Sequence, residues 1–242
     1  MVACYWEFSA SESLPMGHQH SIPLDGCVSL AHIQSNFGGL KVVFIGPRLE
    51  SLKVPIFPGD LIRGVRFLPG ASRAAIGKPG SELFGKFGLL GFEMPDLAKA
   101  FTELVGDCQS LEDLASRPFL KPSDAQVEVM QGVSAITASR GAIKAGELPA
   151  VVGLSERQFQ RVFRNEVGLT PKQYARICRL RSTALDVLNA EQTNWGEIAA
   201  ERGYADQAHL IHEFQALFGI SPREFESRYL VEIEHGEMRK DL

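Results

Sequence analysis

Cysteine is scarce in this chain of 242 residues, which contains only Cys4, Cys27, Cys108 and Cys178. These residues lie far apart in the sequence, and no two of them have the spacing of a zinc-binding CxxC pair. The chain is also too poor in cysteine for the disulfide frameworks that hold small secreted domains together. We therefore expect thiols that pack as small apolar side chains and no structural metal site.

Long apolar runs are missing as well, since no stretch approaches the roughly 18 residues that a membrane-spanning helix needs. Residues 1–7 lack the basic and apolar segments of a secretory leader, so we expect no signal peptide and a cytoplasmic protein. The apolar fraction of 45% and the charged fraction of 22% are ordinary for a globular protein. This length fits one large domain or two small ones.

An excess of positive charge is absent too, because the formal net charge is -4. The charges are unevenly distributed, however, and the segment 157–181 contains a single acid, Glu166. The basic residues of this segment are Arg157, Arg161, Arg164, Lys172, Arg176, Arg179 and Arg181. Charge alone leaves open whether they form a nucleic-acid-binding face or an ordinary solvated face.

The first half of the chain alternates short apolar runs with turn-forming glycine and proline residues. Runs rich in β-branched residues at 28–33, 40–45 and 61–67 predict strands of an antiparallel sandwich or small barrel. Two helices are expected at 71–77 and 94–105. The fold class is therefore α+β, with a mainly β N-terminal domain that includes a few helices.

The pattern of apolar residues changes near residue 120, from short strand-like runs to helical periodicity. Two prolines within Arg117–Pro122 are incompatible with regular structure, so we predict a linker at 117–122 after a domain formed by residues 1–116. Helical periodicity follows, beginning at 124–139, and predicts an all-α domain over 123–230. Residues 231–242 form a polar tail.

The helical half contains an internal repeat of about fifty residues. The segment Gly153–Phe163 matches Gly203–Phe214, and each copy runs on into a Gly-(Leu/Ile)-(Thr/Ser)-Pro motif, at 168–171 and 219–222. A short apolar segment precedes each copy, which predicts two units of helix, tight turn and helix. A single helix over 171–188 joins the two units.

Residues that begin and end helices mark both units. Gly153 and Gly203 stand where the first helix of each unit ends, a place that often requires a positive φ. Ser155 and Gln158 form a capping box, and Asp206 has the same N-terminal position in the second unit. The joining helix is expected to bury Tyr174, Ile177, Cys178, Ala184, Leu185 and Leu188.

This double unit resembles the DNA-binding domain of AraC-family transcriptional regulators, from about Ser123 to Tyr229. The resemblance lies in Gly153-Leu-Ser-Glu-Arg-Gln-Phe-Gln-Arg-Val-Phe, Gly168-Leu-Thr-Pro-Lys, Glu197-Ile-Ala-Ala-Glu-Arg-Gly-Tyr and Phe218-Gly-Ile-Ser-Pro-Arg-Glu-Phe. It implies a sequence-specific regulator, not an enzyme, whose two second helices enter successive major grooves about one DNA turn apart. The expected partner is double-stranded DNA; RNA polymerase, a small-molecule effector and a second copy are further candidates, and no cofactor is expected.

The residues expected to contact DNA lie on the second helix of each unit and on the joining helix. In the first unit they are Ser155, Arg157, Gln160 and Arg161, with Lys172 and Arg176 as phosphate contacts; in the second they are Gln207, Ala208, Ile211 and His212. The second set departs from the family, which commonly has a small polar residue and an arginine at its last two positions. We therefore expect the first unit to supply most of the affinity. Pro149 is a further departure, tolerable if its helix begins near 145–146.

The N-terminal half allows other interpretations. Pro23–Leu30 and Gly64–Ala71 resemble the N-terminal domain of one AraC subgroup, and family members usually place a sensor or dimerisation module there. His18, His20 and His32 suggest a metal-dependent cupin-like enzyme, although the glutamate expected after His20 is missing. The pairs Arg63/Arg66 and Trp6/Phe8 suggest a pocket for an anionic or aromatic ligand, or simply a solvated face and a core strand. A non-DNA-binding interaction adaptor is the third alternative.

Overall fold

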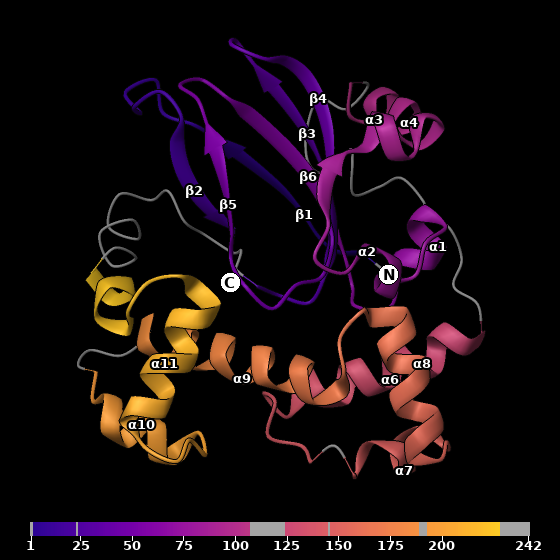
Figure 1. Ribbon diagram of the computed structural model, residues 1–242, viewed down its shortest axis with the longest axis vertical. Helices are drawn as coiled ribbons and strands as arrows, with labels where there is room; N and C mark the ends of the chain where they lie inside the picture. Colours follow the sequence, from indigo (N-terminus) through magenta and orange to yellow (C-terminus); the bar gives the residue numbers. More distant parts are fainter. Residues whose placement is uncertain (1, 23, 107–123, 145, 189–192, 228–242) are drawn as a thin grey trace.

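A computed structural model describes residues 2–22, 24–106, 124–144, 146–188 and 193–227 of the chain. The β-rich half and the helical half lie against each other, with the helices along one end of the strands (Figure 1). The α+β class is confirmed. The predicted linker at 117–122 and the polar tail at 231–242 lie outside the described residues.

The N-terminal half is built on a five-stranded antiparallel sheet with the order β1-β6-β3-β4-β7. Its strands are β1 (Val2–Ser9), β6 (Leu61–Phe67), β3 (Val28–Ser35), β4 (Gly39–Ile45) and β7 (Phe87–Leu89), and a separate pair is formed by β2 (His18–Ile22) and β5 (Leu52–Ile56). The three predicted strands are confirmed. Of the other four, only β1 had been suggested from the sequence, as the alternative of a core strand at Trp6 and Phe8.

Within residues 2–106, apart from residue 23, the helices that accompany the sheet are α1 (Ser72–Ile76), α2 (Gly80–Leu83), α3 (Leu90–Glu93) and α4 (Pro95–Gly106). Phe101 and Val105 of α4 share a buried core with Leu30, Phe44 and Phe67 of the sheet, because alternate residues of each strand face the helices. The helices predicted at 71–77 and 94–105 are confirmed as α1 and α4. On the opposite face of β6, Gly64 leaves room for the Trp6 ring, with which any Cβ there would collide.

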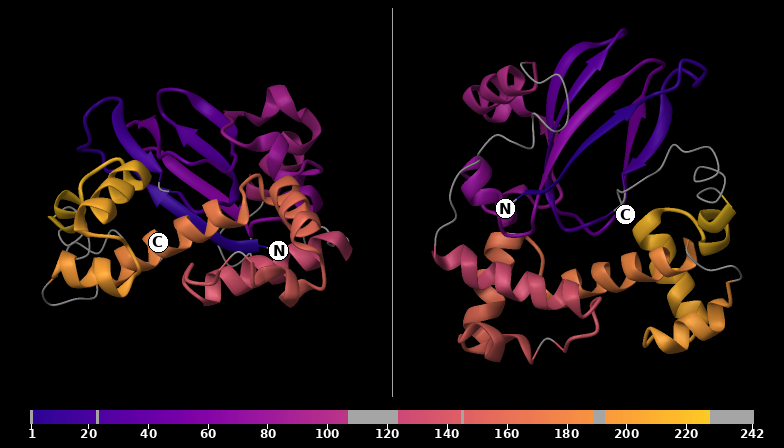
Figure 2. Two further views of the ribbon diagram at one scale, coloured as in Figure 1. Left: turned by 60° about the horizontal axis from the view of Figure 1, so that its bottom comes forward. Right: turned by 180° about the vertical axis from the view of Figure 1, so that it is seen from behind.

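The C-terminal half contains α6 (Asp124–Ala138), α7 (Leu148–Val152), α8 (Glu156–Val167), α9 (Pro171–Leu188), α10 (Trp195–Glu201) and α11 (Gln207–Phe218). The first unit, α7 and α8, lies at one end of α9, and the second unit, α10 and α11, lies at the other (Figures 1 and 2). This arrangement confirms the predicted repeat. Helix α7 begins at Leu148, slightly later than expected, and Pro149 lies in its first turn as its missing N–H requires.

The buried face of α9 was predicted only in part. Tyr174, Ile177 and Ala184 are buried, but Leu185 is 39% exposed and that prediction is wrong. Leu180 and Val187 are buried instead, because α9 contacts α6 and α8 near one end and α11 near the other, so its buried stripe turns along the helix. Cys178 is half-buried, and the side chain of Leu188 lies outside the described residues.

The two halves share a packed interface. Leu24, from the loop before β3, belongs to the same buried cluster as Phe163 and Tyr174 of the helical half. Gly26 lies so close to Tyr174 that a Cβ would stand 2.8 Å from its ring. Asp25, between them, pairs with Arg66 of β6 at 2.9 Å and with Arg181 of α9 at 3.9 Å, joining sheet and helix electrostatically.

Two general expectations concern membranes and cysteines. None of the described helices is long and apolar enough to cross a membrane. Cys4, Cys27 and Cys178 are half-buried, and Cys108 lies outside the described residues. Burial raises the pKa of Cys27 and of Cys178, which favours the protonated, unreactive thiol.

Candidate nucleic-acid interface

The first unit positions α8 through a chain of local signals. Gly153 ends α7 in the left-handed region with φ 71°, and Ser155 begins α8. The Ser155 hydroxyl accepts from the Gln158 backbone N–H at 3.4 Å, while the Gln158 side-chain oxygen accepts from the Ser155 N–H at 3.2 Å. This reciprocal cap fixes the start of the helix, and Phe159 and Phe163 anchor its inner face in the core.

The outer face of α8 presents the predicted contacts to solvent. Arg157, Gln160 and Arg161 are all exposed, and Gln160 donates a hydrogen bond to Glu156 at 3.1 Å. Within the described part of the chain, no acid lies within ion-pair distance of Arg157 or Arg161. Both guanidinium groups are therefore available for base edges or phosphates.

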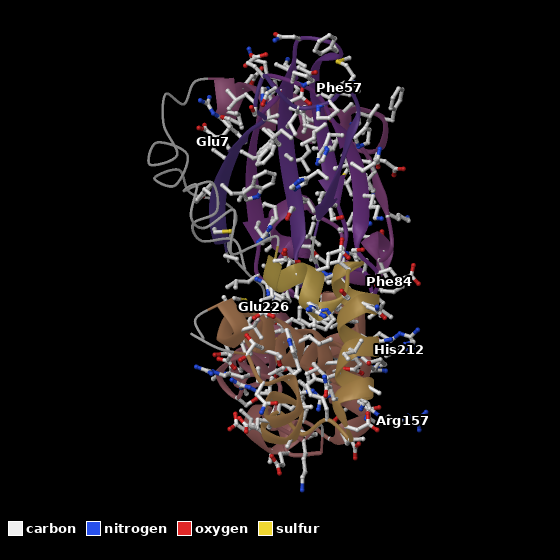
Figure 3. All side chains as sticks on the ribbon, turned by 90° about the vertical axis from the view of Figure 1, so that its left-hand side faces the viewer. Glu7, Phe57, Phe84, Arg157, His212 and Glu226 are labelled. Atoms are coloured by element: carbon white, nitrogen blue, oxygen red, sulfur yellow. The ribbon has the colours of Figure 1, made fainter. Side chains whose placement is uncertain are left out.

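The second unit places α11 in the same way but with different chemistry. The Asp206 carboxylate accepts from the His209 N–H at 2.7 Å and caps the helix. Gln207, Ala208 and His212 are exposed, and Ile211 is half-buried. Arg157 and His212 project from the same side of the molecule (Figure 3), so one ligand surface can meet both second helices.

Two arginines of α9 are already engaged within the protein. Arg176 pairs with the buried Glu213 of α11 at 2.8 Å, and Arg179 lies 4.0 Å from the same carboxylate and 4.7 Å from the centre of the Tyr204 ring. Arg176 is thus a less available phosphate contact than the sequence suggested. Glu213 was not among the residues singled out from the sequence, and its burial was not predicted.

A basic hollow of about 190 Å³ lies beside the start of α9. Its lining includes Lys172, Arg176 and Arg179 of this helix together with Lys144 from the loop before α7. Lys144 was not among the predicted contacts. The only sequence signal for it was a positive charge in the short connection between α6 and α7.

The histidines of the N-terminal half are placed on two different strands and do not assemble a metal site. His18 and His20 lie on β2, where the His20 ring is 5.1 Å from Phe8, and His32 lies on β3. Among the described residues, no group of His, Cys, Asp or Glu could hold a metal ion. Burial and the neighbouring His18 lower the pKa of His20, which favours its neutral form.

The predicted ligand pocket takes a different form from the one expected. Arg63 and His32, which face each other across β6 and β3, line a hollow of about 200 Å³ together with Thr102 of α4. Arg66 and Trp6 are not in its lining, because alternate strand residues point to opposite faces. His32 is 7% exposed and its Nε2 has no hydrogen-bond partner within the described structure.

Residues 148–228 match the model of a family described as "Helix-turn-helix domain". The chain is 30% identical over 84 residues to the probable transcriptional regulator LumQ of Photobacterium leiognathi, covering 35% of this chain and 34% of that protein. It is 35% identical over 75 residues to the probable thc operon regulatory protein of Rhodococcus erythropolis, covering 30% of this chain and 23% of that protein. The matched part thus spans about a third or less of these relatives.

Among solved structures, the chain is similar to a transcriptional regulator from Chromobacterium violaceum described as having an AraC-type DNA-binding domain. The identity is 23% and the TM-score 0.40, over 43% of this chain and 93% of that one.

Proposed function

We propose that this chain, in which residues 148–228 form a helix-turn-helix domain of the AraC type, is a sequence-specific DNA-binding transcription regulator that reads two successive major grooves. The observation that supports it best is the placement of two capped helices, α8 and α11, at opposite ends of α9. With 18 residues, α9 is roughly 27 Å long, which suits units that must lie about one DNA turn apart.

The two units have unequal roles in this proposal. Arg157, Gln160 and Arg161 of α8 read bases, with the Ser155 end of the helix and Lys172 on phosphates. In α11, Ile211 contacts a thymine methyl, and Gln207, Ala208 and His212 make the weaker contacts of the second half-site. Arg176, which Glu213 already partly neutralises, is the weaker phosphate contact of α9.

The test begins with selection of binding sites from random duplex oligonucleotides by the whole protein. Gel-shift titrations of Gln160→Ala and Arg161→Ala on the selected site should each show a roughly 5- to 150-fold loss of affinity, because a bidentate base contact is worth about 1–3 kcal/mol. His212→Ala should change affinity less than about threefold. Lys99→Ala, which removes an exposed positive charge from α4 in the N-terminal half, is the control.

The outcomes separate the alternatives. Equal losses for the variants of α8 and α11 would refute the unequal roles. Failure to select any site, or affinity that does not change between roughly 50 and 200 mM salt, would refute DNA binding and favour the interaction adaptor. A stoichiometric metal in the purified protein would favour the cupin-like enzyme, for which the described histidines form no ligand set.

The remaining parts of the proposal concern the N-terminal half. We assign residues 1–116 to a sensor or dimerisation domain, 117–122 to the connection and 123–230 to the DNA-binding domain of a cytoplasmic regulator. The hollow at His32 and Arg63 suits a small carboxylate effector that competes with Glu7, which pairs with Arg63 at 2.6 Å, for the guanidinium beside the His32 imidazole and apolar Leu61 and Val105. A thermal-shift screen of small carboxylates, repeated with Arg63→Gln, tests this assignment. RNA polymerase and a second copy are the further partners we propose.

A further inference from the structure

We propose that Glu213 is a positioning residue that fixes the second unit on α9 and withholds two arginines from the DNA backbone. This inference rests on the proposed function. The residue lies on the inner side of α11 and is 9% exposed. A lone carboxylate in such a place costs several kcal/mol of desolvation, so its cationic partners are essential to the fold.

The partners of Glu213 come from both sides of the joint between α9 and the second unit. Arg176 Nε lies 2.8 Å from Oε1, and Arg179 lies 4.0 Å from Oε2. His209 Nε2, one turn earlier on α11, lies 3.4 Å from Oε1. Arg179 also covers the ring of Tyr204, which stands between α10 and α11, so a single cluster holds α9, the turn and α11 together.

The first unit has no such cluster at the equivalent place. Phe159 aligns with Leu210 and Phe163 with Phe214, so Val162 of α8 corresponds to Glu213. Val162 is a partly buried side chain that packs against the apolar core. At this position the first unit therefore relies on apolar packing alone, whereas the second unit adds a buried ion cluster to its apolar packing.

The cluster also changes what the basic hollow can offer to DNA. Arg176 and Arg179 line it together with Lys144 and Lys172, and the Glu213 carboxylate cancels one of the two arginine charges. Without the carboxylate, both guanidinium groups would be released toward phosphates, while the second unit would lose its fixed angle on α9. Glu213 thus lowers sequence-independent affinity and enforces the separation of the two half-sites.

The experiment uses the full chain and the selected operator, with half-sites at native separation and with one or two base pairs inserted. The slope of log K against log salt should be steeper by roughly 1 to 2 for Glu213→Gln than for wild type, because each added phosphate contact contributes about 0.9. Insertions should weaken the wild type at least about tenfold and this variant less than about threefold, since a mismatched contact costs about 1–3 kcal/mol.

Two controls isolate the effect. Glu201→Gln removes the same charge from an exposed position on α10, where no ion pair is formed within the described structure, and should change neither the slope nor the spacing preference. The double variant Glu213→Gln/Arg176→Gln should have a salt slope about 1 lower than that of Glu213→Gln, because the released arginine is gone. In the wild-type background, Arg176→Gln should change the slope by less than about half as much. Circular dichroism verifies folding, and Glu213→Val, the residue type of the first unit, replaces the glutamine variant if that one unfolds.

If the wild type binds the operator and Glu213→Gln has the same salt slope and spacing preference as Glu201→Gln, this inference is overturned and the proposed function is not. If both Glu213 variants unfold, Arg176→Gln alone decides the question through the slope of log K against log salt. A decrease in that slope of about 0.9, the value of one full phosphate contact, would overturn the inference. A decrease of less than about half that value would support it. Wild-type protein that selects no DNA would overturn the proposed function together with the inference.

Discussion

Replacing Arg73 by methionine should destabilise the protein through the interface between its two halves. Arg73 of α1 contacts both carboxylate oxygens of Glu166 on α8, with Nε 3.1 Å from each and the terminal nitrogen 2.9 Å from Oε1. The hydrogen bonds to Glu166 raise the pKa of Arg73. Glu166 is nearly covered, with 7% of its side chain exposed, and its other side-chain donor is Asn165 at 2.8 Å.

The expected loss in the free energy of unfolding depends on the Glu166 carboxylate that Arg73→Met leaves without its arginine partner. Removing one partner of a fully buried pair costs about 3–5 kcal/mol, because the other charge stays unpaired in the interior. Arg73 is 42% exposed, so water can reach the vacated side and Asn165 still donates. We therefore expect a loss of about 2–3 kcal/mol in the free energy of unfolding. For a chain of this length the corresponding fall in Tm is roughly 4 to 12 °C.

Urea unfolding at neutral pH, followed by circular dichroism, measures this loss. Arg164→Met is the matched control, since Arg164 is exposed on the same helix and should cost less than about 0.5 kcal/mol. Adding Glu166→Gln to Arg73→Met should recover at least about 1 kcal/mol, because a neutral amide replaces the stranded charge. A cost for Arg73→Met within about 0.5 kcal/mol of the control, or a double variant no more stable than the single one, would refute this account.

The other predictions concern four positions. Both Gly153 and Gly168 have positive φ, so alanine at either position should lower the free energy of unfolding by about 1–2 kcal/mol. At Gly168 the added Cβ would also stand 2.5 Å from a backbone oxygen of α2. Thermal melts should therefore show a larger loss for Gly168→Ala than for Gly153→Ala, and equal losses would count against the close approach. Burial, and then Arg63, lower the pKa of His32, so the unfolded chain takes up this proton first and stability is lost as pH falls below about 6.5. His32→Gln should therefore lose less Tm than wild type between pH 7 and 5, and identical losses would contradict this reasoning. Ser155→Ala removes the cap of α8 and should cost about 1 kcal/mol, measured by urea unfolding; a change in stability below the error of the fit would argue against the capping box.

Local signals in the sequence were sufficient to predict the helical half. Ser155 and Asp206 cap the helices to which they were assigned, and Gly153 adopts the expected left-handed conformation. These features depend on residues within one turn of each other, so they can be recognised in a single sequence. The exposure of Arg157 and Arg161 followed from the same periodicity.

Features that depend on distant residues could not be predicted in this way. The burial of Glu213 depends on arginines more than thirty residues earlier in the sequence, which no local pattern reveals. Leu185 lies on the average apolar stripe of α9, but the stripe turns where the helix changes partners. Asp25 bridges the two halves of the chain and Gly26 lies against the Tyr174 ring, and both contacts involve residues about 40 to 155 positions away in the sequence.

The loop around Leu24 also imposes an order of events on biosynthesis. Its carbonyl accepts a hydrogen bond from Arg181 at 3.3 Å, and its side chain fills a core made of residues from the other end of the chain. A ribosome that adds about 5–20 residues per second needs roughly 8 to 30 s to reach those residues after Leu24 has been made. During that interval the Leu24 side chain has no core to enter, so the nascent N-terminal half exposes to solvent an apolar group that the finished protein buries.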